Sequence, residues 1–357
     1  MDSQLIITIN PGSTSTKIAV FEEDKPIFEK NIKHSTSELE SFHRITDQFD
    51  FRKDIITKEL KKAGINFENV VAIVGRGGLV RPIESGVYAV NRSMIDDLKE
   101  SARGEHASNL GGLIAYALLK ECPGSKAYIA NPVVVDELDE IARISGHPLF
   151  PRKSVFHALN QKATARRHAK AIGKKYEDIN LIVAHLGGGI SVGAHRRGRV
   201  IDVNQAIGGE GPFSPERAGT LPVIDVVKAC FSGKYTEEEM TKMLIGKGGL
   251  AAYLDTNNAM EVEDRVKKGD KKATLIYEAM AYQVAKIIGE MYTVLKGDVD
   301  NILITGGIAY DKWFVEKIRE RVHKLAPCAI YPGENEMEAL AMNGLRAIND
   351  PSIVKEY

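Results

Sequence analysis

The first part of the chain alternates short runs of strand-forming residues with tight polar turns. Runs at residues 5–10, 16–21 and 27–32 are rich in β-branched and aromatic side chains, which predicts a three-strand meander. A helical stretch over residues 37–63 follows and ends at Gly64. Strands and helices then alternate, which favours an α/β domain with a mixed sheet. The further elements expected there are strands at 70–74 and 126–130 and helices near 93–102 and 109–120.

The second half repeats the opening pattern after a helix expected over about 155–173. Residues 181–203 have the order strand, small-residue turn, strand, charged turn, strand. Two such meanders, one in each half, predict a duplicated fold. The remaining expected elements are a long helix over 272–295 with an apolar stripe, a strand at 301–305, a helix from about 311 and a final helix over 336–348.

The turns of both meanders carry groups that suit a polyphosphate. The first turn, from Asn10 to Lys17, offers backbone N–H groups, hydroxyls and one lysine, which are donors without bulk plus a positive charge. It is not the common P-loop, because the G-x-x-x-x-G-K-[ST] spacing is absent and a strand follows. An ordinary polar hairpin turn is the alternative. The repeat of a turn rich in small residues at 187–189 favours phosphate binding over that alternative. The Gly306-Gly307 pair before a helix puts backbone N–H groups and a helix N-terminus beside a ligand.

Composition narrows the class of protein. The 357 residues include 48 Lys plus Arg and 48 Asp plus Glu, so nothing indicates nucleic acid or an anionic membrane as a partner. Cys122, Cys230 and Cys328 lie far apart and fit reduced thiols. The N-terminus is not basic, and no apolar run approaches the roughly 20 residues that span a bilayer. We therefore expect a cytoplasmic protein without signal peptide or membrane span.

Four motifs follow one another along the chain: Asn10-x-Gly12-Ser13-x-Ser15-x-Lys17, Phe156-His157, Ala184-His185-Leu186-Gly187-x-Gly189 and the helical segment 280–289. In this order they resemble the motifs of the acetate and butyrate kinase family within the actin-like ATPase superfamily. The resemblance covers essentially the whole chain, and segments 208–219 and 306–311 are most similar to the butyrate kinase members, including branched-chain variants.

The resemblance implies an α/β, duplicated actin-like (ribonuclease H-like) fold with two lobes, mixed sheets flanked by helices, and a central cleft. The first lobe would span residues 1–153, with the C-terminal helix 337–357 packed back on it. The second lobe would span residues 154–336 and hold the nucleotide site and the interface of a homodimer or higher homo-oligomer.

The implied activity is reversible transfer of the ATP γ-phosphate to the carboxylate of butyrate or a similar short or branched fatty acid, giving an acyl phosphate. ATP or ADP, Mg²⁺ and a small carboxylate are thus the implied ligands. A carboxylate is already ionised at neutral pH, so no strong general base is required and the chemical problem is electrostatic. Arginines, Mg²⁺ and backbone N–H groups suit that problem.

By resemblance, two arginines and one histidine act on the reacting groups. Arg217 is assigned to the transferring phosphoryl group, with a surface loop arginine as the alternative. Arg76 is assigned to the substrate carboxylate, and Arg81 is a nearby competitor. His157 would donate a hydrogen bond to the phosphoryl oxygens, while a capping or core histidine is the alternative.

The implied metal residues are Asp136, which would orient Mg²⁺ through water, and Asn10. Asp139 is the alternative acid, and an asparagine before proline also suits a turn without a ligand. Lys17 would reach the ATP phosphates unless it is an exposed hairpin lysine, and His185 would line the phosphate channel unless it is strand core. The nucleotide-binding set as a whole is Asn10, Gly12, Ser13, Ser15, Lys17, His185, Gly187, Gly188, Gly189, Asn258, Gly306 and Gly307.

Three departures separate this chain from acetate kinases. Gly188 replaces the asparagine of a Gly-Asn-Gly turn, and Asn258-Ala-Met260 replaces the Asp-x-Arg that helps to hold the nucleotide. Tyr310 replaces a glutamate that touches metal binding in the family, so Asp311 or Glu338 would have to substitute for it. These changes favour a butyrate-type enzyme.

Two other functions fit the same superfamily. A sugar or polyol kinase would need an aspartate base for a hydroxyl, and Asp136 is the candidate. A chaperone-like or filament-forming ATPase would use its nucleotide state to control partners, although we expect no appended peptide-binding domain after the last helix. A fold alone does not decide among these functions.

Overall fold

The structure, a computed structural model, describes residues 4–357, which fall into two compact units. The first contains residues up to Val135 and Asn335–Tyr357, and the second contains Asp136–Glu334. We expected the boundary after residue 153, whereas residues 136–153 group with the second unit. Contacts with its sheet explain the difference, since the Asp139 N–H donates to the Ile201 carbonyl at 2.9 Å. Residues 1–3, on which the expectation of no signal peptide rests, lie outside the described part.

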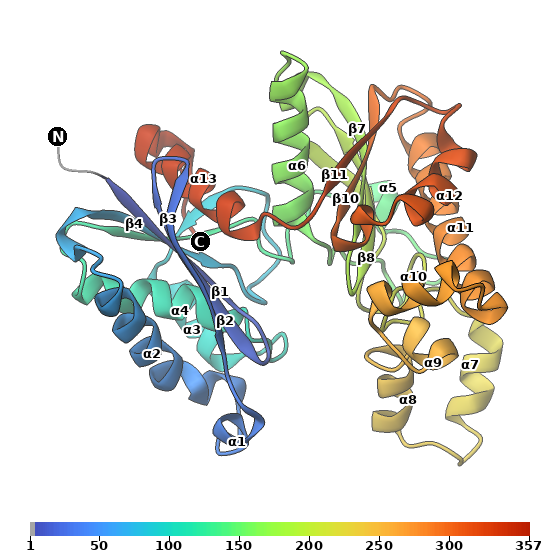
Figure 1. The fold of residues 1–357 in the computed structure, drawn as a ribbon, viewed down its shortest axis with the longest axis horizontal. Helices are drawn as coiled ribbons and strands as arrows, with labels where there is room; N and C mark the ends of the chain where they lie inside the picture. The colour runs from blue at the N-terminus through green and yellow to red at the C-terminus, as the bar shows by residue number, and fades with distance from the viewer. Residues whose placement is uncertain (1–3) are drawn as a thin grey trace. The chain divides into compact units, whose positions relative to one another are not determined.

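The first unit is built on one mixed sheet with the strand order β12-β5-β6-β4-β1-β2-β3 (Figure 1). The predicted meander is confirmed, because β1, β2 and β3 pair antiparallel, and β4 and β6 continue the sheet in parallel with β1. The short strands β5 and β12 were not predicted. The strand bounds are β1 (Leu5–Pro11), β2 (Ser15–Glu22), β3 (Lys25–Lys33), β4 (Val70–Arg76), β5 (Val87–Ala89), β6 (Lys126–Ala130) and β12 (Val354–Lys355).

Two helices, α1 and α2, stand where one helix over 37–63 was expected, so the prediction was wrong for the middle of that range. Asp47 explains the restart, because its carboxylate accepts the Arg44 N–H at 2.9 Å and begins a new helical turn at Ile45–Gln48. The helices of this unit are α1 (Thr36–Leu39), α2 (Phe49–Lys62), α3 (Arg92–Glu100), α4 (Asn109–Ala117) and α13 (Glu336–Asn349).

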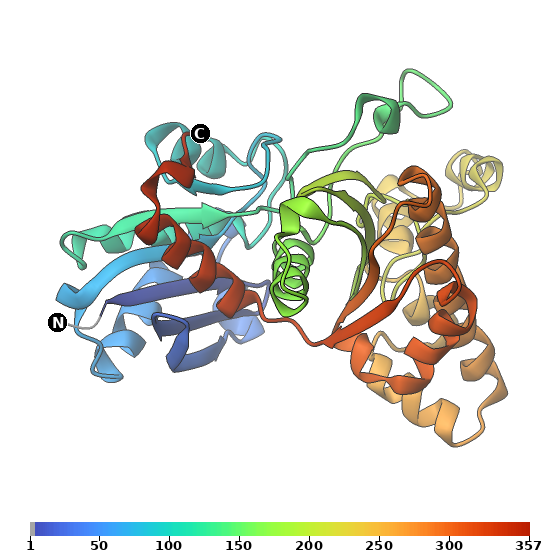
Figure 2. The same cartoon turned by 90° about the horizontal axis from the view of Figure 1, so that it is seen from above.

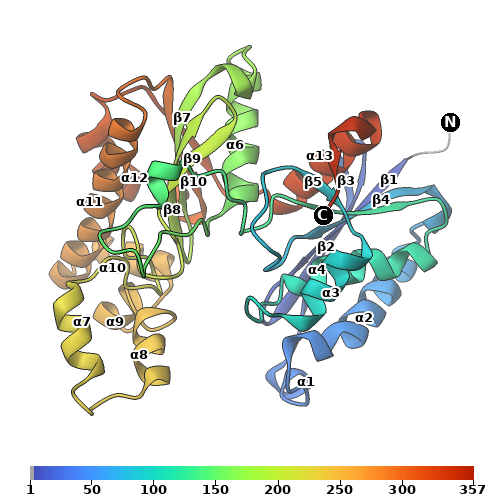
Figure 3. The same ribbon diagram turned by 180° about the vertical axis from the view of Figure 1, so that it is seen from behind.

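Helices α4 and α13 lie on opposite faces of this sheet (Figures 1 and 3). A Cβ on Gly344 of α13 would lie 2.7 Å from the Val74 side chain, and one on Gly75 would lie 2.2 Å from the Gly111 carbonyl oxygen of α4. Consecutive strand residues face opposite sides, so these two contacts identify the two faces. The close packing of Gly75 against Gly111 fixes the end of β4, where Arg76 follows.

The second unit repeats this arrangement with the order β11-β10-β7-β8-β9. Strands β7, β8 and β9 pair antiparallel, and β10 and β11 extend the sheet in parallel with β7. The duplicated fold is therefore confirmed at the level of strand order. The bounds are β7 (Asn180–Leu186), β8 (Ile190–Arg196), β9 (Arg199–Val203), β10 (Asn301–Gly306) and β11 (Cys328–Pro332).

Helices α6 and α11 cover the two faces of this second sheet (Figures 2 and 3). Val183 packs in one cluster with Ala165 of α6, and Ile182 packs in another with Met280 of α11. The predicted apolar stripe of the long helix therefore faces the core. Within the described residues, no helix is long and apolar enough to cross a membrane. The helices are α5 (Glu140–Arg143), α6 (Ala158–Ala171), α7 (Val223–Cys230), α8 (Glu237–Leu244), α9 (Leu250–Leu254), α10 (Ala259–Lys267), α11 (Lys271–Val294) and α12 (Lys312–Val322).

Candidate active site

The turn between β1 and β2 is held from inside the unit by Arg52 of α2, a residue that the sequence analysis missed. The Arg52 guanidinium is 1% exposed and donates to the carbonyl oxygens of Gly12 (2.7 Å), Ser13 (3.0 Å) and Ser15 (3.0 Å). Its remaining donors bind the hydroxyl of Thr16 and the amide oxygen of Gln48. Arg52 therefore satisfies the inward-facing acceptors of the whole turn.

The other backbone groups of this turn complete the arrangement. The Thr14 carbonyl accepts the His34 N–H at 2.9 Å, and the Gly12 N–H donates to Ser15 across the turn at 2.8 Å. Burial lowers the pKa of Arg52 to about 10, so its guanidinium remains charged at neutral pH. The turn thus presents the exposed Ser13 and Thr14 on a backbone whose carbonyls are already occupied.

Asn10 and Arg76 meet at the ends of the parallel strands β1 and β4, and Glu336 at the start of α13 joins them. Arg76 Nη1 donates to Asn10 Oδ1 at 3.2 Å and forms an ion pair with Glu336 Oε1 at 3.0 Å. The Asn10 amide nitrogen donates to Glu336 Oε2. Asp311 or Glu338 was expected as the substitute acid, whereas Glu336, two residues before Glu338, contacts this pair.

The other two candidate cations of the first unit, Arg81 and Lys17, have partners that differ from those of Arg76. The Arg81 guanidinium lies 4.0 Å from the centre of the Tyr357 ring, and its backbone N–H donates to the Tyr357 hydroxyl at 3.0 Å. Lys17 is part exposed and pairs with Glu29 on β3 at 3.4 Å. Arg81 is therefore engaged with the end of the chain, and of the two arginines only Arg76 contacts Asn10.

The Gly-rich turn between β7 and β8 is shaped around Arg217. A Cβ on Gly189 would lie 1.9 Å from Arg217 Nη1, so only glycine leaves room for the guanidinium. Arg217 Nη1 donates to the Ala206 carbonyl at 2.8 Å, and burial lowers the pKa of Arg217. Across the turn, the Gly187 N–H donates to Gly189 at 3.0 Å and the Ser214 hydroxyl donates to the Gly188 carbonyl at 2.7 Å.

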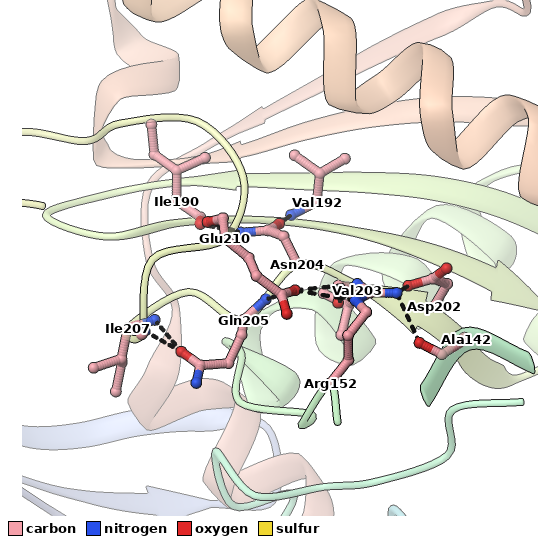
Figure 4. A network of polar contacts seen from close by, with 11 residues as sticks. Ala142, Arg152, Ile190, Val192, Asp202, Val203, Asn204, Gln205, Ile207 and Glu210 are labelled. Carbon is pink, nitrogen blue, oxygen red and sulfur yellow. Dashed lines mark hydrogen bonds and ion pairs between the residues drawn. The ribbon is translucent and has the colours of Figure 1, made fainter. Parts of the chain in front are cut away.

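A polar network fixes the start of the loop that carries Arg217 (Figure 4). The Asn204 amide accepts from the Val192 N–H at 2.7 Å and donates to the Ile190 carbonyl at 3.1 Å, which joins the loop to β8. Arg152 binds Asp202 at 2.9 Å and Glu210 at 3.2 Å. The side chains of Asn204 and Arg152 therefore hold the start of this loop in place.

His157 and His185 lie side by side in the second unit. Their ring centroids are 4.4 Å apart with an interplanar angle of 34°. His157 occupies the N-cap position of α6 without a side-chain capping hydrogen bond, and its Nδ1 lies 2.8 Å from the Ser191 hydroxyl. His185 on β7 is 1% exposed and lies 3.3 Å from Glu334 Oε1. The ring of His157 therefore packs against the ring of His185, which lies near the end of β7 and next to the Gly-rich turn.

The acidic candidates of the second unit are engaged. Asp136 Oδ2 accepts from Arg143 Nη1 at 2.6 Å and Oδ1 accepts from the Leu138 N–H at 3.3 Å, while Asp139 pairs with Arg196 at 2.9 Å. Asp311 caps α12 through the Trp313 and Phe314 N–H groups, and burial raises the pKa of Asp311. Among the described residues, no group of three or more His, Cys, Asp or Glu side chains is arranged to hold a metal ion.

The last turn, after β10, is a close-packed glycine pair. Gly306 has φ +96°, and a Cβ there would lie 2.3 Å from the Leu186 carbonyl oxygen, so the position requires glycine. A Cβ on Gly307 would meet nothing within 4 Å. Asn258, another predicted nucleotide residue, caps α10 by accepting the Met260 N–H at 3.1 Å.

The duplicated mixed sheets, each with an antiparallel meander and a turn rich in small residues, define the actin-like ATPase fold. A crystal structure of acetate kinase from Porphyromonas gingivalis has the same fold, with a TM-score of 0.79 at 18% identity over 97% of this chain and 100% of that one. Residues 147–348 match the model of the acetokinase family.

Closer relatives cover the whole chain. Butyrate kinase 1 and butyrate kinase 2 of Clostridium acetobutylicum are each 56% identical to it over 352 residues, which is 99% of this chain and 99% of each relative. The chain belongs to the acetokinase family and is a carboxylate-phosphorylating kinase. The family resemblance and the kind of activity expected from the sequence are thus confirmed.

Replacing Arg52 with methionine should loosen the first turn. The variant leaves the carbonyls of Gly12, Ser13 and Ser15 without their buried donor, and we expect a loss of about 3 kcal/mol in the free energy of unfolding. Hydrogen exchange measured by mass spectrometry should show faster exchange in the peptide that spans residues 12–17.

Arg92→Met is the matched control for this change. Arg92 is exposed on α3 and pairs only weakly with Asp96, at 3.4 Å, so its loss should change stability by no more than about 0.5 kcal/mol. An Arg52→Met protein whose turn exchanges as slowly as the wild type would contradict the assigned role of Arg52.

Proposed function

We propose that this protein transfers the γ-phosphoryl group of ATP, with Mg²⁺, reversibly to the carboxylate of butyrate or a similar short or branched fatty acid. The observation that carries the proposal is the 56% identity over 99% of the chain with two butyrate kinases. Cytoplasmic localisation is part of the proposal, and the three free cysteines support it.

The engaged acids support a carboxylate acceptor over a sugar hydroxyl. A sugar kinase needs a carboxylate that is available to take a proton from the attacking hydroxyl. Both oxygens of Asp136, the candidate base, accept hydrogen bonds from Arg143 and Leu138. A fatty acid arrives already ionised, so its phosphorylation needs no such base.

In the proposed step, a carboxylate oxygen forms a bond to the γ-phosphorus while the bond from that phosphorus to the ADP oxygen breaks. Arg76 would bind the acid with its other guanidinium N–H groups, since its described contacts with Asn10 and Glu336 both use Nη1. Arg217 stabilises the negative charge on the transferring phosphoryl group, and His157 donates a hydrogen bond to its oxygens.

The nucleotide is proposed to bind through the turns. Backbone N–H groups at Ser13 and Ser15 and at Gly188 and Gly189 would bind phosphate oxygens, while Gly12 and Gly187 shape the two turns through their own N–H groups. The side chains of Asn10, Lys17 and His185 are nearby in the sequence. Gly307 would leave room for the adenosine, and Asn258 would contact it.

A Mg²⁺ ion fits these residues as a partner of the nucleotide. Mg²⁺ keeps several waters and is usually bound through one or two carboxylates plus phosphate oxygens, so no three-acid cage is required. Asn10 and Asp136 would hold it, through water, and Glu336 is an additional carboxylate beside Asn10. When bound, the ion neutralises charge on the phosphates.

Acyl phosphate formation tests the proposal directly. With ATP and Mg²⁺, hydroxylamine should trap an acyl phosphate from butyrate or isobutyrate with a higher kcat/KM than from acetate, and chelation of the metal should abolish turnover. No turnover with any acid from C2 to C5 would contradict the proposal. Phosphorylation of sugars alone would favour a sugar kinase, and ATP hydrolysis indifferent to carboxylates would favour a chaperone-like ATPase.

The arginine roles give distinct kinetic outcomes. Arg217→Ala should lower kcat by about 10²–10³, because it removes a donor to the developing charge. Arg76→Ala should raise the KM for the carboxylate by roughly 10–100-fold, the effect of one charge-assisted hydrogen bond or ion pair. Arg81→Met is the control and should leave both constants within about twofold of the wild type. A raised carboxylate KM in Arg81→Met but not in Arg76→Ala would reverse the assignment.

We also propose a homodimer or higher homo-oligomer assembled through the second unit. Helix α7 is labelled in Figure 1 and has no buried residue. Val223 and Ile224 on it and Phe231 directly after it are 67–87% exposed. Light scattering should give a mass of at least twice the 39.2 kDa chain, and Ile224→Asp combined with Phe231→Asp should lower it to that of one chain. Ile27→Asp, an exposed apolar position of β3, is the control and should not change the mass.

A further inference from the structure

A chain of buried hydrogen bonds runs through the second unit and ends at His157. The Tyr176 hydroxyl lies 2.7 Å from His195 Nδ1, and His195 Nε2 lies 2.9 Å from Gln161 Oε1. Gln161 Nε2 lies 2.8 Å from the Ser191 hydroxyl, which lies 2.8 Å from His157 Nδ1. The four side chains before His157 are at most 2% exposed.

The direction of these hydrogen bonds is fixed at a backbone carbonyl. Gln161 Nε2 also lies 3.1 Å from the Ser191 carbonyl oxygen, which can only accept, so this atom is the NH₂ group. The Gln161 oxygen therefore faces His195 and accepts from His195 Nε2–H. Burial, with Lys162 and Arg166 nearby, lowers the pKa of His195 well below its usual value. His195 is thus neutral, and its bare Nδ1 accepts from Tyr176.

The same reasoning determines the proton at Ser191. Among the described contacts, its hydroxyl oxygen accepts from Gln161 Nε2 at 2.8 Å and from the His157 backbone N–H at 3.4 Å. Its single hydrogen then has His157 Nδ1, at 2.8 Å, as acceptor. A neutral His157 that accepts at Nδ1 carries its proton on Nε2.

We propose that Gln161 and Ser191 are positioning residues that hold His157 in its Nε2–H tautomer, so that Nε2 donates a hydrogen bond to the transferring phosphoryl group. The opposite tautomer would present a lone pair to an anion and repel it. The tautomer of His157 does not depend on the proposed function, whereas the hydrogen bond from Nε2 to phosphoryl oxygens rests on the proposed function.

Nitrogen NMR of the full-length protein, labelled with ¹⁵N-histidine and free of nucleotide, measures the His157 tautomer and does not require catalytic activity. The signals of His157 among the nine histidines are assigned by their loss in His157→Gln. We expect a neutral ring with the proton on Nε2 at pH 7.5. In Ser191→Ala the ratio of Nε2–H to Nδ1–H should fall about tenfold, the effect of one lost hydrogen bond. Gln161→Met, of similar size, should lower the same ratio.

Tyr176→Phe is the matched control, because it removes a buried hydrogen bond at the end of the hydrogen-bond series that is farthest from His157. The Ser191 carbonyl fixes the orientation of the Gln161 amide, so this variant should leave the His157 tautomer unchanged. A protonated Nδ1 in the wild type, or an unchanged tautomer ratio in both Ser191→Ala and Gln161→Met, would overturn the inference.

Kinetics test the second part of the proposal. Ser191→Ala and Gln161→Met should lower kcat about tenfold while the KM values for ATP and acid stay within about twofold. An altered tautomer with kcat unchanged would overturn the positioning role. If the wild type phosphorylates no acid, the proposed function fails, yet the NMR result still decides the tautomer.

Discussion

The occupation of turn carbonyls by a buried cation is the interaction on which the first half of the site depends. A turn can offer N–H groups to an anion only if its own carbonyl oxygens are bound elsewhere, because exposed carbonyls would repel the anion. Arg52 meets this need at Gly12, Ser13 and Ser15 with one rigid group. The planar guanidinium has five donors, so a single side chain replaces the several waters that would otherwise occupy these acceptors.

The second unit meets the same need with different residues. The Ser214 hydroxyl binds the Gly188 carbonyl, and Asn204 joins β8 to the loop that carries Arg217. Here the arginine lies directly against the turn, and Gly189 has no side chain because the guanidinium occupies that space. This close approach explains in physical terms why the Gly-rich turn has no side chain at its third position.

Periodicity and turn chemistry predicted both meanders, the long helix and the strand before Gly306, since each depends on local sequence. The break between α1 and α2 was missed because the apolar spacing continues across it, whereas Asp47 starts a new helical turn by accepting the Arg44 N–H. The roles of Arg52 and Glu336 were missed for another reason. Each is separated from its partners by dozens or hundreds of residues, and a buried arginine has the same sequence signature as an exposed one. Only the packing of α2 and α13 against the sheet brings them to their partners.

The electrostatic character of the second unit's site follows from what surrounds its charges. Burial lowers the pKa of Arg217, and the hydrogen-bond partner of its guanidinium is a neutral carbonyl. Because that partner carries no negative charge, the positive charge of Arg217 is available to an incoming anion. Asp136 and Asp139, in contrast, are paired with arginines. In the proposed reaction, an available Arg217 and engaged acids would attract two anionic reactants. In the proposed Nε2–H tautomer, His157 would add a hydrogen-bond donor to such a site without adding a charge.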